Sequence, residues 1–232
     1  MTALRSNRFA LRLDFAAACR HFAPVMIYDP ESLLSISLHI RHRRSIKPVD
    51  MDATRTVDRE LLDVLFENAN HAPTHGLTEP WRFHVFQGEG RRELSAMMQK
   101  IYRETTPANE FREDKMRKMS ENPLLASAVI AIGMERRGGA KIPEVEEIES
   151  VACAVQNMHL TASAVGLAAY WSTPPLLLTP EFISWLGLKQ EDRCLGLFYI
   201  GWPKPGLVWP DAHRTPVAEK IIWHEEGGAA HE

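Results

Sequence analysis

The sequence predicts an α+β fold, because stretches typical of strands alternate with segments of helical periodicity along most of its 232 residues. Apolar residues alternate at Trp81, Phe83 and Val85, which is the period of a strand with one buried face. A helical period runs through residues 59–70, where apolar residues recur at three- and four-residue spacing. No glycine-rich turn follows the first predicted strand, so the dinucleotide-binding fingerprint is absent.

The predicted helices are bounded by residues with known capping preferences. Asp58 is placed to cap the first clear helix, and Thr179 followed by Pro180 starts a short helix that Gly187 ends. Gly166 is placed to end a long apolar helix. In chain order we predict a helix over 30–40, a helix over 59–70, a strand at 81–86, a helix over 91–102, a strand around 129–132, a helix over 150–165, a strand at 168–172, a short helix from 180, a strand at 194–200 and an extended tail.

Three segments are less regular. Residues 104–122 are charged, contain Pro107 and lack an apolar stripe, so we expect a weakly packed excursion over a cleft. The acidic run at 144–149 is expected to be a solvated helix face. The tail after Gly201 is rich in proline and has a possible final strand at 218–223. Because this tail is too extended to pack on itself, we expect it to cross onto a second subunit and to bury its three tryptophans there.

The first thirty residues differ from the rest in composition. They contain four arginines and only two acidic residues, and they lack a long apolar segment, so a secretory signal is not expected. An organellar transit peptide and a docking arm are both compatible with this composition. We expect residues 1–30 to be a poorly ordered extension and residues 31–232 to form one domain.

Several classes of protein are excluded by composition and spacing. The 45% hydrophobic and 25% charged residues are ordinary for a globular domain, and a formal net charge of −3 gives no reason to expect nucleic acid or a membrane as partner. The three cysteines are far apart and odd in number, which argues against a disulfide framework and favours a reducing cytoplasm. His71 and His75 have the spacing of a helical metal pair, but Pro73 lies between them, so we expect no metal.

The segment Arg43-Arg44-Ser45 is the first candidate site. Two guanidinium groups and a hydroxyl are suited to a phosphate, because arginine donors match the geometry of its oxygens. The alternative is a solvated basic helix end, which the helix dipole favours. No aromatic residues are interleaved with these arginines, so a nucleic-acid surface is a poorer interpretation.

Two further segments are candidate site material. Pro73-Thr74-His75 lies on a predicted loop before a strand, where binding residues are common, although an exposed connecting loop explains it equally well. Residues 166–173 close a helix and open a strand, with small residues at Ala168 and Ala169 that permit close approach of the backbone. Close packing of the helix on the strand would by itself explain them.

Together these motifs resemble the nitroreductase family, in particular its small, minimal NAD(P)H members. The resemblance covers about residues 31–224 and rests on motifs in a fixed order. They are Arg43-Arg44-Ser45, the A-P-x-x-x-x-x-x-P-W pattern over 72–81, the long helix ending at Gly166, the run 197–201, and the R-x-P-x-x-E pattern over 214–219.

The resemblance implies a homodimer with a central mixed sheet flanked by helices, a C-terminal arm that crosses to the partner, and FMN at the dimer interface. It implies a ping-pong reaction in which NAD(P)H passes a hydride to FMN N5 and a nitroaromatic, quinone or similar acceptor then enters, with no obligatory catalytic side chain. By position, the residues that would bind FMN are Arg43, Arg44, Ser45, His75, Glu79, Trp171, Ser172, Thr173 and Arg214. Those at the expected nicotinamide site are Thr161, Ala162, Ser163, Ala164, Val165 and Gly166.

The sequence departs from the family pattern in the loop before the first strand. Leu77 and Glu79 replace an asparagine and a glutamine, and an ionised carboxylate cannot donate a hydrogen bond to the edge of the flavin ring. The departure bears on substrate choice. The alternative functions are a flavin-binding carrier or sensor without turnover, and a related flavin reaction such as dehalogenation, which residues 104–122 would decide.

Overall fold

A computed structural model of the chain describes residues 29–137, 139 and 141–224. The extension predicted for residues 1–30 lies outside the described residues, apart from Asp29 and Pro30. By its internal contacts the chain divides into two units, with the boundary between Ser37 and Leu38. The sheet and the site described below belong to the second unit.

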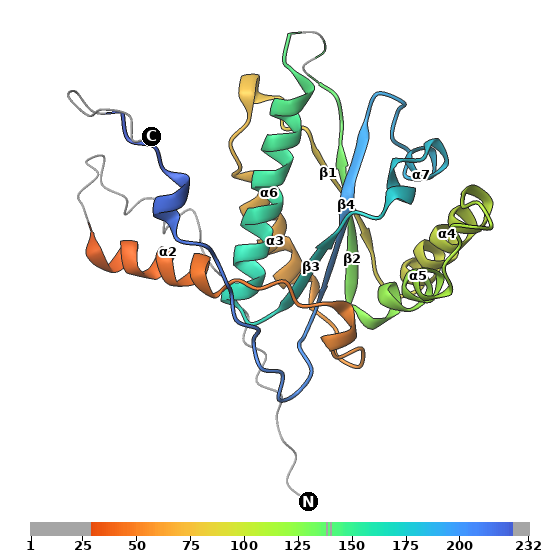
Figure 1. Cartoon of the computed structure of the whole chain (residues 1–232), viewed down its shortest axis with the longest axis horizontal. Coiled ribbons are helices and arrows are strands. Elements are labelled where there is room, and N and C mark those ends of the chain that lie inside the picture. Colours follow the sequence, from red (N-terminus) through yellow and green to blue (C-terminus); the bar gives the residue numbers. More distant parts are fainter. Residues whose placement is uncertain (1–28, 138, 140, 225–232) are drawn as a thin grey trace, which may run out of the picture. The chain divides into compact units, whose positions relative to one another are not determined.

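The described elements follow the predicted order with one additional helix (Figure 1). The helices are α2 (Pro30–His42), α3 (Arg59–Asn70), α4 (Gly90–Thr105), α5 (Glu113–Leu125), α6 (Glu144–Ala164) and α7 (Pro180–Trp185). The strands are β1 (Trp81–Phe86), β2 (Ala128–Met134), β3 (Ala168–Ser172) and β4 (Arg193–Gly201). Short 3₁₀ turns lie at η1 (Pro48–Asp50), η2 (His75–Leu77), η3 (Pro175–Leu178) and η4 (Val217–Lys220).

The four strands form one sheet in the order β1-β2-β4-β3. All three strand pairings of the described residues are antiparallel. The α+β class is therefore confirmed, whereas the mixed sheet expected from the resemblance is not found within the described chain. The physical reason is that strands running in the same direction are not neighbours: β2 and β3 are both antiparallel to β4, which lies between them.

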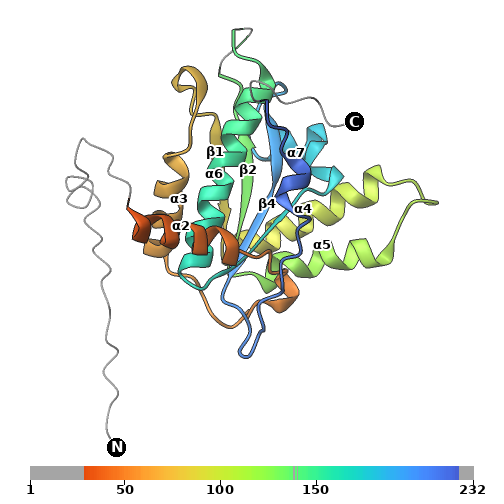
Figure 2. The same ribbon diagram turned by 60° about the vertical axis from the view of Figure 1, so that its left-hand side comes forward.

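Two cores cover the two faces of this sheet. Figure 1 and Figure 2 show α3 and α6 on one face and α4, α5 and α7 on the other. Side chains alternate along the strands, so that Phe198 and Ile200 of β4 enter the α3–α6 core, while Leu197 and Tyr199 enter the opposite core.

Several predicted features are confirmed and others need correction. Thr179 caps α7, because its hydroxyl accepts a hydrogen bond from Phe182 N at 3.3 Å. Asp58 stands at the N-cap of α3 but its side chain makes no capping bond. Gly166 and Gly187 follow their helices with φ of 77° and 74°, the left-handed conformation that glycine adopts readily.

The segment predicted as a weakly packed excursion contains helix α5. Its contact with the core depends on Met116, Met119 and Pro123, and a pattern of only three buried side chains is hard to recognise in a charged sequence. The acidic run at 144–149 forms the first turns of α6, but one member is not solvated. Glu147 is buried, pairs with Arg136, and accepts a hydrogen bond from Arg137 N at 3.0 Å.

The tail differs from its prediction in two ways. No strand forms at 218–223, where the chain makes the 3₁₀ turn η4 and then extends. Trp202 and Trp209 pack on the chain itself, with the indole N–H of Trp202 donating to Thr56 O at 3.0 Å, whereas Trp223 is 76% exposed. Part of the tail therefore finds its packing within the subunit.

Within the described residues, no helix is both long enough and apolar enough to span a membrane.

Candidate functional site

The segment Arg43-Arg44-Ser45 leaves α2 and runs beside the edge strand β3. The amide of Ile46 donates a hydrogen bond to Ala169 O at 2.9 Å, which joins the segment to β3. The guanidinium of Arg44 donates to Pro210 O at 2.6 Å, which joins it to the C-terminal tail. The segment is thus held by two regions that are more than one hundred residues away in the sequence.

His159 of α6 supports the same segment from the α3–α6 face. Its Nε2 lies 3.0 Å from Arg44 O, and both ring nitrogens lie 3.5 Å from Nη1 of Arg43. The ring packs edge-on against Phe198 at a centroid separation of 5.4 Å. Burial, and after it the positive charge of Arg43, lowers the pKa of His159 to about 4, so the imidazole is neutral near pH 7.

Three positive charges come together at this place. Burial lowers the pKa of Arg43, and the nearby positive charges of Arg214 and Arg44 lower it further. None of the three guanidinium groups forms an ion pair with an acidic side chain in the described part of the chain. Because like charges repel and these have no protein counter-charge, the cluster is suited to an anion.

The end of β3 presents different side chains to the two faces of the sheet. Trp171 points to the α3–α6 face, where its indole N–H donates to Leu195 O at 3.1 Å. Gly196 makes room for it, because a Cβ at that position would lie 2.1 Å from Trp171 Nε1. Ser172 points to the other face, and Thr173 follows immediately after the strand.

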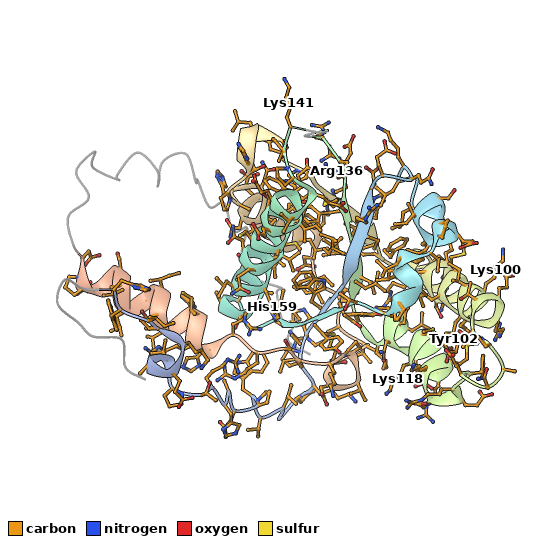
Figure 3. All side chains as sticks on the ribbon, turned by 45° about the horizontal axis from the view of Figure 1, so that its top comes forward. Lys100, Tyr102, Lys118, Arg136, Lys141 and His159 are labelled. Atoms are coloured by element: carbon orange, nitrogen blue, oxygen red, sulfur yellow. The ribbon has the colours of Figure 1, made fainter. Side chains whose placement is uncertain are left out.

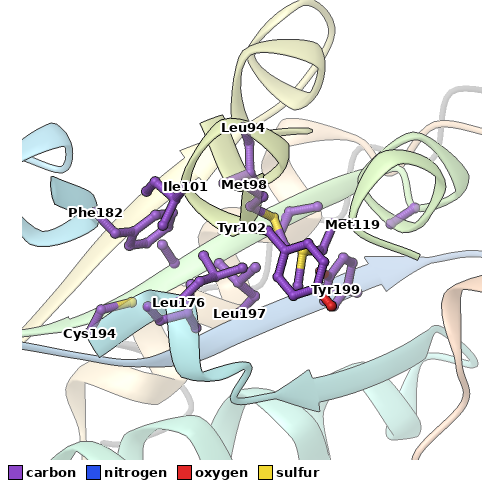
Figure 4. Packing of buried hydrophobic residues seen from close by; sticks show 14 of the residues in the cluster. Leu94, Met98, Ile101, Tyr102, Met119, Leu176, Phe182, Cys194, Leu197 and Tyr199 are labelled. Carbon is purple, nitrogen blue, oxygen red and sulfur yellow. The ribbon is translucent and has the colours of Figure 1, made fainter. Parts of the chain in front are cut away.

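A cavity of about 610 Å³ lies between helices α4 and α5 on one side and β3 and η3 on the other. We call it the α4–α5 cavity. Figure 4 shows Met98, Tyr102, Met119 and Tyr199 gathered where these elements meet. Ser172 and Pro174 form part of the wall, so the cavity adjoins the predicted segment 171–173.

The aromatic and sulfur side chains of the α4–α5 cavity were not among the predicted site residues. The only signal for them was the prediction that residues 104–122 cover a cleft. Burial raises the pKa of Tyr199, so its phenol stays protonated and can donate a hydrogen bond. Tyr102 and Lys118 line this cavity, and Figure 3 shows both of them well separated from His159.

His75 and Glu79 lie away from the arginine cluster of their own chain. His75 contacts Glu146, which lies in the first turn of α6, whereas His159 lies near the other end of that helix. Thirteen residues of α helix separate Glu146 from His159, which corresponds to about 20 Å. Glu79 has a positive φ of 43°, an uncommon conformation for this residue type.

The expected nicotinamide site, residues 161–166, comprises the last turn of α6 and the two residues that follow it. The Thr161 hydroxyl is used inside the fold, since it donates to Asn157 O and accepts from Asn68 Nδ2, both at 2.9 Å. Ala162 is buried, whereas residues 164–166 are exposed. Burial therefore excludes Ala162 from direct contact with a ligand, and residues 164–166 are the most accessible part of the segment.

His71 and His75, the pair considered for a metal, have separate acidic partners. His71 lies 3.4 Å from Glu67, and His75 contacts Glu146. No grouping of three or more potential metal ligands is present in the described ranges.

Comparison with known proteins identifies relatives of the whole fold. YdjA of Escherichia coli (strain K12), a proposed NAD(P)H nitroreductase, is 29% identical over 146 residues, which are 62% of this chain and 77% of that protein. The crystal structure of a nitroreductase-like family protein from Bacillus cereus superposes with a TM-score of 0.71 at 28% identity, covering 87% of this chain and 99% of that one.

A variant of the FMN- and NADPH-dependent nitroreductase NfnB from sphigopyxis sp. strain HMH shares the fold, with a TM-score of 0.64 at 19% identity over 83% of this chain and 99% of the relative. The model of the nitroreductase family matches residues 40–202, which include the arginine segment, the whole sheet and the α4–α5 cavity. The chain belongs to the nitroreductase family.

Proposed function

We propose that this chain is an FMN-dependent NAD(P)H oxidoreductase of the nitroreductase type that works as a homodimer. The observation that carries the proposal is the cluster of Arg43, Arg44 and Arg214, which has no acidic partner among the described residues. The relatives named above as NAD(P)H nitroreductases, one of them FMN-dependent, support the same function.

The described residues fit FMN in both charge and space. The phosphate would bind to the three guanidinium groups and to Ser45, which together supply donors and compensate its charge. The flavin ring would lie against residues 171–173 and extend into the α4–α5 cavity, whose volume of about 610 Å³ leaves room beside it for a second molecule.

When bound, FMN would accept a hydride from NAD(P)H and deliver it to an acceptor such as a nitroaromatic or a quinone. The contribution of this chain is to bind and orient the reactants. Arg43 and Arg44 are held by His159 and Pro210, so the anion site needs little rearrangement on binding. Because one flavin ring would serve both substrates in turn, we expect ping-pong kinetics.

The nicotinamide cofactor would approach along the exposed residues 164–166 at the end of α6. The small side chain of Ala164 and the absence of one at Gly166 leave this surface smooth. The neighbouring Thr161 would keep the helix end in place through its bonds to α3 and α6.

We propose that the site is completed by a second copy of the chain. His75 and Glu79 lie about 20 Å along α6 from the arginine cluster, so they would contact the flavin held by the partner rather than that of their own subunit. Exposed apolar residues of the tail would supply the contact surface, since Val217 is 68%, Ile222 82% and Trp223 76% exposed.

The absorption spectrum of the purified protein tests the function directly. We expect a flavin spectrum, release of FMN on heat denaturation, and bleaching of the visible band when NADPH or NADH is added without oxygen. FAD as the released cofactor would overturn the proposal. A bound flavin that is not bleached by either nucleotide would favour the carrier or sensor.

The dimer is tested by light scattering on the Trp223→Glu variant. Since this residue is exposed in the single chain, the substitution should leave the fold intact and weaken assembly. We expect a shift towards monomer with loss of FMN, whereas Ala96→Glu, at an exposed position on α4 away from His75 and the tail, serves as control. A wild-type monomer that retains FMN would contradict the two-chain site.

For the location of the protein we propose the cytosol, since the cysteine spacing shows no disulfide framework.

A further inference from the structure

The α4–α5 cavity has an apolar, aromatic interior. Met98, Tyr102, Met119, Leu176 and Tyr199 line it and are each no more than 8% exposed. Flat rings pack well against tyrosine faces, and thioether side chains adapt to rings of different shape. The interior is therefore suited to an aromatic or similarly flat apolar group.

The rim of the same cavity is charged. Lys115 and Lys118 of α5 and Glu110 from the preceding loop line it, which leaves a net charge of +1 on these three side chains. Asp114 forms ion pairs with both Arg112 at 2.8 Å and Lys118 at 3.7 Å, so these three side chains together still carry one net positive charge. Lys115 forms no ion pair with any described residue.

The two walls of the cavity thus differ in role. One wall, formed by β3 and η3, contains Ser172 and Pro174, where the proposed function places the flavin ring. The facing wall, formed by α5, contributes the two lysines. A molecule that spans the cavity would present one end to the flavin and the other to a positive charge.

We infer that the electron acceptor is an aromatic compound that carries a carboxylate or a comparable anionic group, which Lys115 and Lys118 bind. This inference rests on the proposed function, because it assigns the substrate class of that site. The ring would pack between Met119 and Tyr199, and the reducible group would point to residues 172–174.

The experiment compares two acceptors of similar shape and different charge. These are 4-nitrobenzoate and 4-nitrobenzamide, assayed with the dimeric holoprotein and either nicotinamide nucleotide. The variants are Lys115→Met, Lys118→Met and the double substitution, which keep the length and apolar stem of the side chain. Lys100→Met serves as control, because Lys100 is an exposed lysine of α4 that does not line the cavity.

For the double variant we expect kcat/KM for 4-nitrobenzoate to fall about tenfold, mainly through KM. The value for 4-nitrobenzamide should change less than about twofold, since a neutral amide loses no charge-assisted contact. Raising the salt concentration should reduce the wild-type preference for the anion. Equal losses for the two acceptors would overturn the inference.

One rival explanation is that the lysines bind the phosphates of NAD(P)H. Rapid mixing of the oxidised holoprotein with NADPH measures this step alone, and we expect the double variant to show the wild-type dissociation constant. A weakened nucleotide affinity with an unchanged anion preference would overturn the inference and assign the lysines to the nucleotide.

A binding measurement separates this inference from the proposed function. Isothermal titration calorimetry of the two nitro compounds needs no turnover. Tighter binding of 4-nitrobenzoate that is lost in the double variant would support the anion site even if neither nucleotide reduced the protein. Equal binding of both compounds by the wild type would overturn the inference, whether or not the protein proved to be a reductase.

Discussion

The two faces of the sheet are packed in different ways. Aliphatic side chains are the most numerous in both cores, but the α3–α6 core contains more alanines, and its residues Leu62, Leu65, Met158 and Phe198 are inaccessible to solvent. The α4–α5 core contains more methionines, and a cavity of about 610 Å³ lies beside two of them, Met98 and Met119. One sheet therefore combines a closed core with an open one.

The two faces of the sheet therefore contribute to the site in different ways. The closed face holds the fixed supports of the site, namely His159 behind the arginine segment and Trp171 at the end of β3. The open face provides the space in which a flat ligand can bind. A site of this kind needs rigid support on one side and a preformed cavity on the other.

Truncating a methionine on each face compares the two cores most directly. Met158→Ala should lower the free energy of unfolding by about 4 kcal/mol, because the tightly packed α3–α6 core cannot collapse around the space created. Met98→Ala should cost only about 2 kcal/mol, since Met98 borders a cavity that already exists. Urea denaturation of both variants measures the difference, and equal losses would contradict the comparison.

The close packing of Trp171 against β4 gives the next largest effect. A methyl group at residue 196 would collide with the indole and with Ser172 O, and the backbone there has a φ of 145°. We expect Gly196→Ala to lower the free energy of unfolding by about 3 kcal/mol, through strain and overpacking together. Gly90→Ala is the control, because its new methyl group would meet nothing closer than 3.7 Å. A stable Gly196→Ala protein would show that Trp171 can move.

His159 should make the closed face sensitive to acid. Its pKa of about 4 in the folded state is below its ordinary value of 6.5, so the unfolded chain binds a proton more readily. This contribution to stability is complete above pH 6.5 and is lost as the pH falls towards 4. Between pH 7.5 and pH 5 we expect a loss of about 2 kcal/mol from this residue alone.

The measurement for His159 is urea denaturation at both pH values, with His159→Phe as the comparison. Phenylalanine keeps a ring for the contact with Phe198 and cannot be protonated. The variant should therefore lose less stability between the two pH values than the wild type. Identical pH dependence of both proteins would show that His159 does not carry the effect.

Tyr199 on the open face should give the smallest effect on stability. Its hydroxyl forms no hydrogen bond with another described residue, so Tyr199→Phe should change the free energy of unfolding by less than about 0.5 kcal/mol. Tyr102→Phe should cost about 1 kcal/mol, because the Tyr102 hydroxyl accepts a hydrogen bond from Arg112 N at 3.0 Å. Chemical denaturation compares the two, and a larger loss for Tyr199→Phe would reveal a partner for its hydroxyl.

Prediction from the sequence was most accurate where local signals decide the structure. Helix α3 begins at Arg59 and ends at Asn70 as predicted, and β3 occupies residues 168–172. Both follow from periodicity and from the residues at their ends, which act within a few positions of the chain. Prediction failed for α5, because its three buried contacts depend on which side of the segment meets α4.

Patterns in the sequence were sufficient to predict the order of the elements, the α+β class and, through the resemblance to the nitroreductase family, the positions at which a flavin is expected. How those positions combine became known from the three-dimensional packing. It placed Arg214 beside Arg43, buried His159 behind them, paired Glu147 with Arg136, and enclosed the α4–α5 cavity. These are contacts between residues far apart in the chain, and their formation depends on how helices and strands pack, which no local pattern specifies.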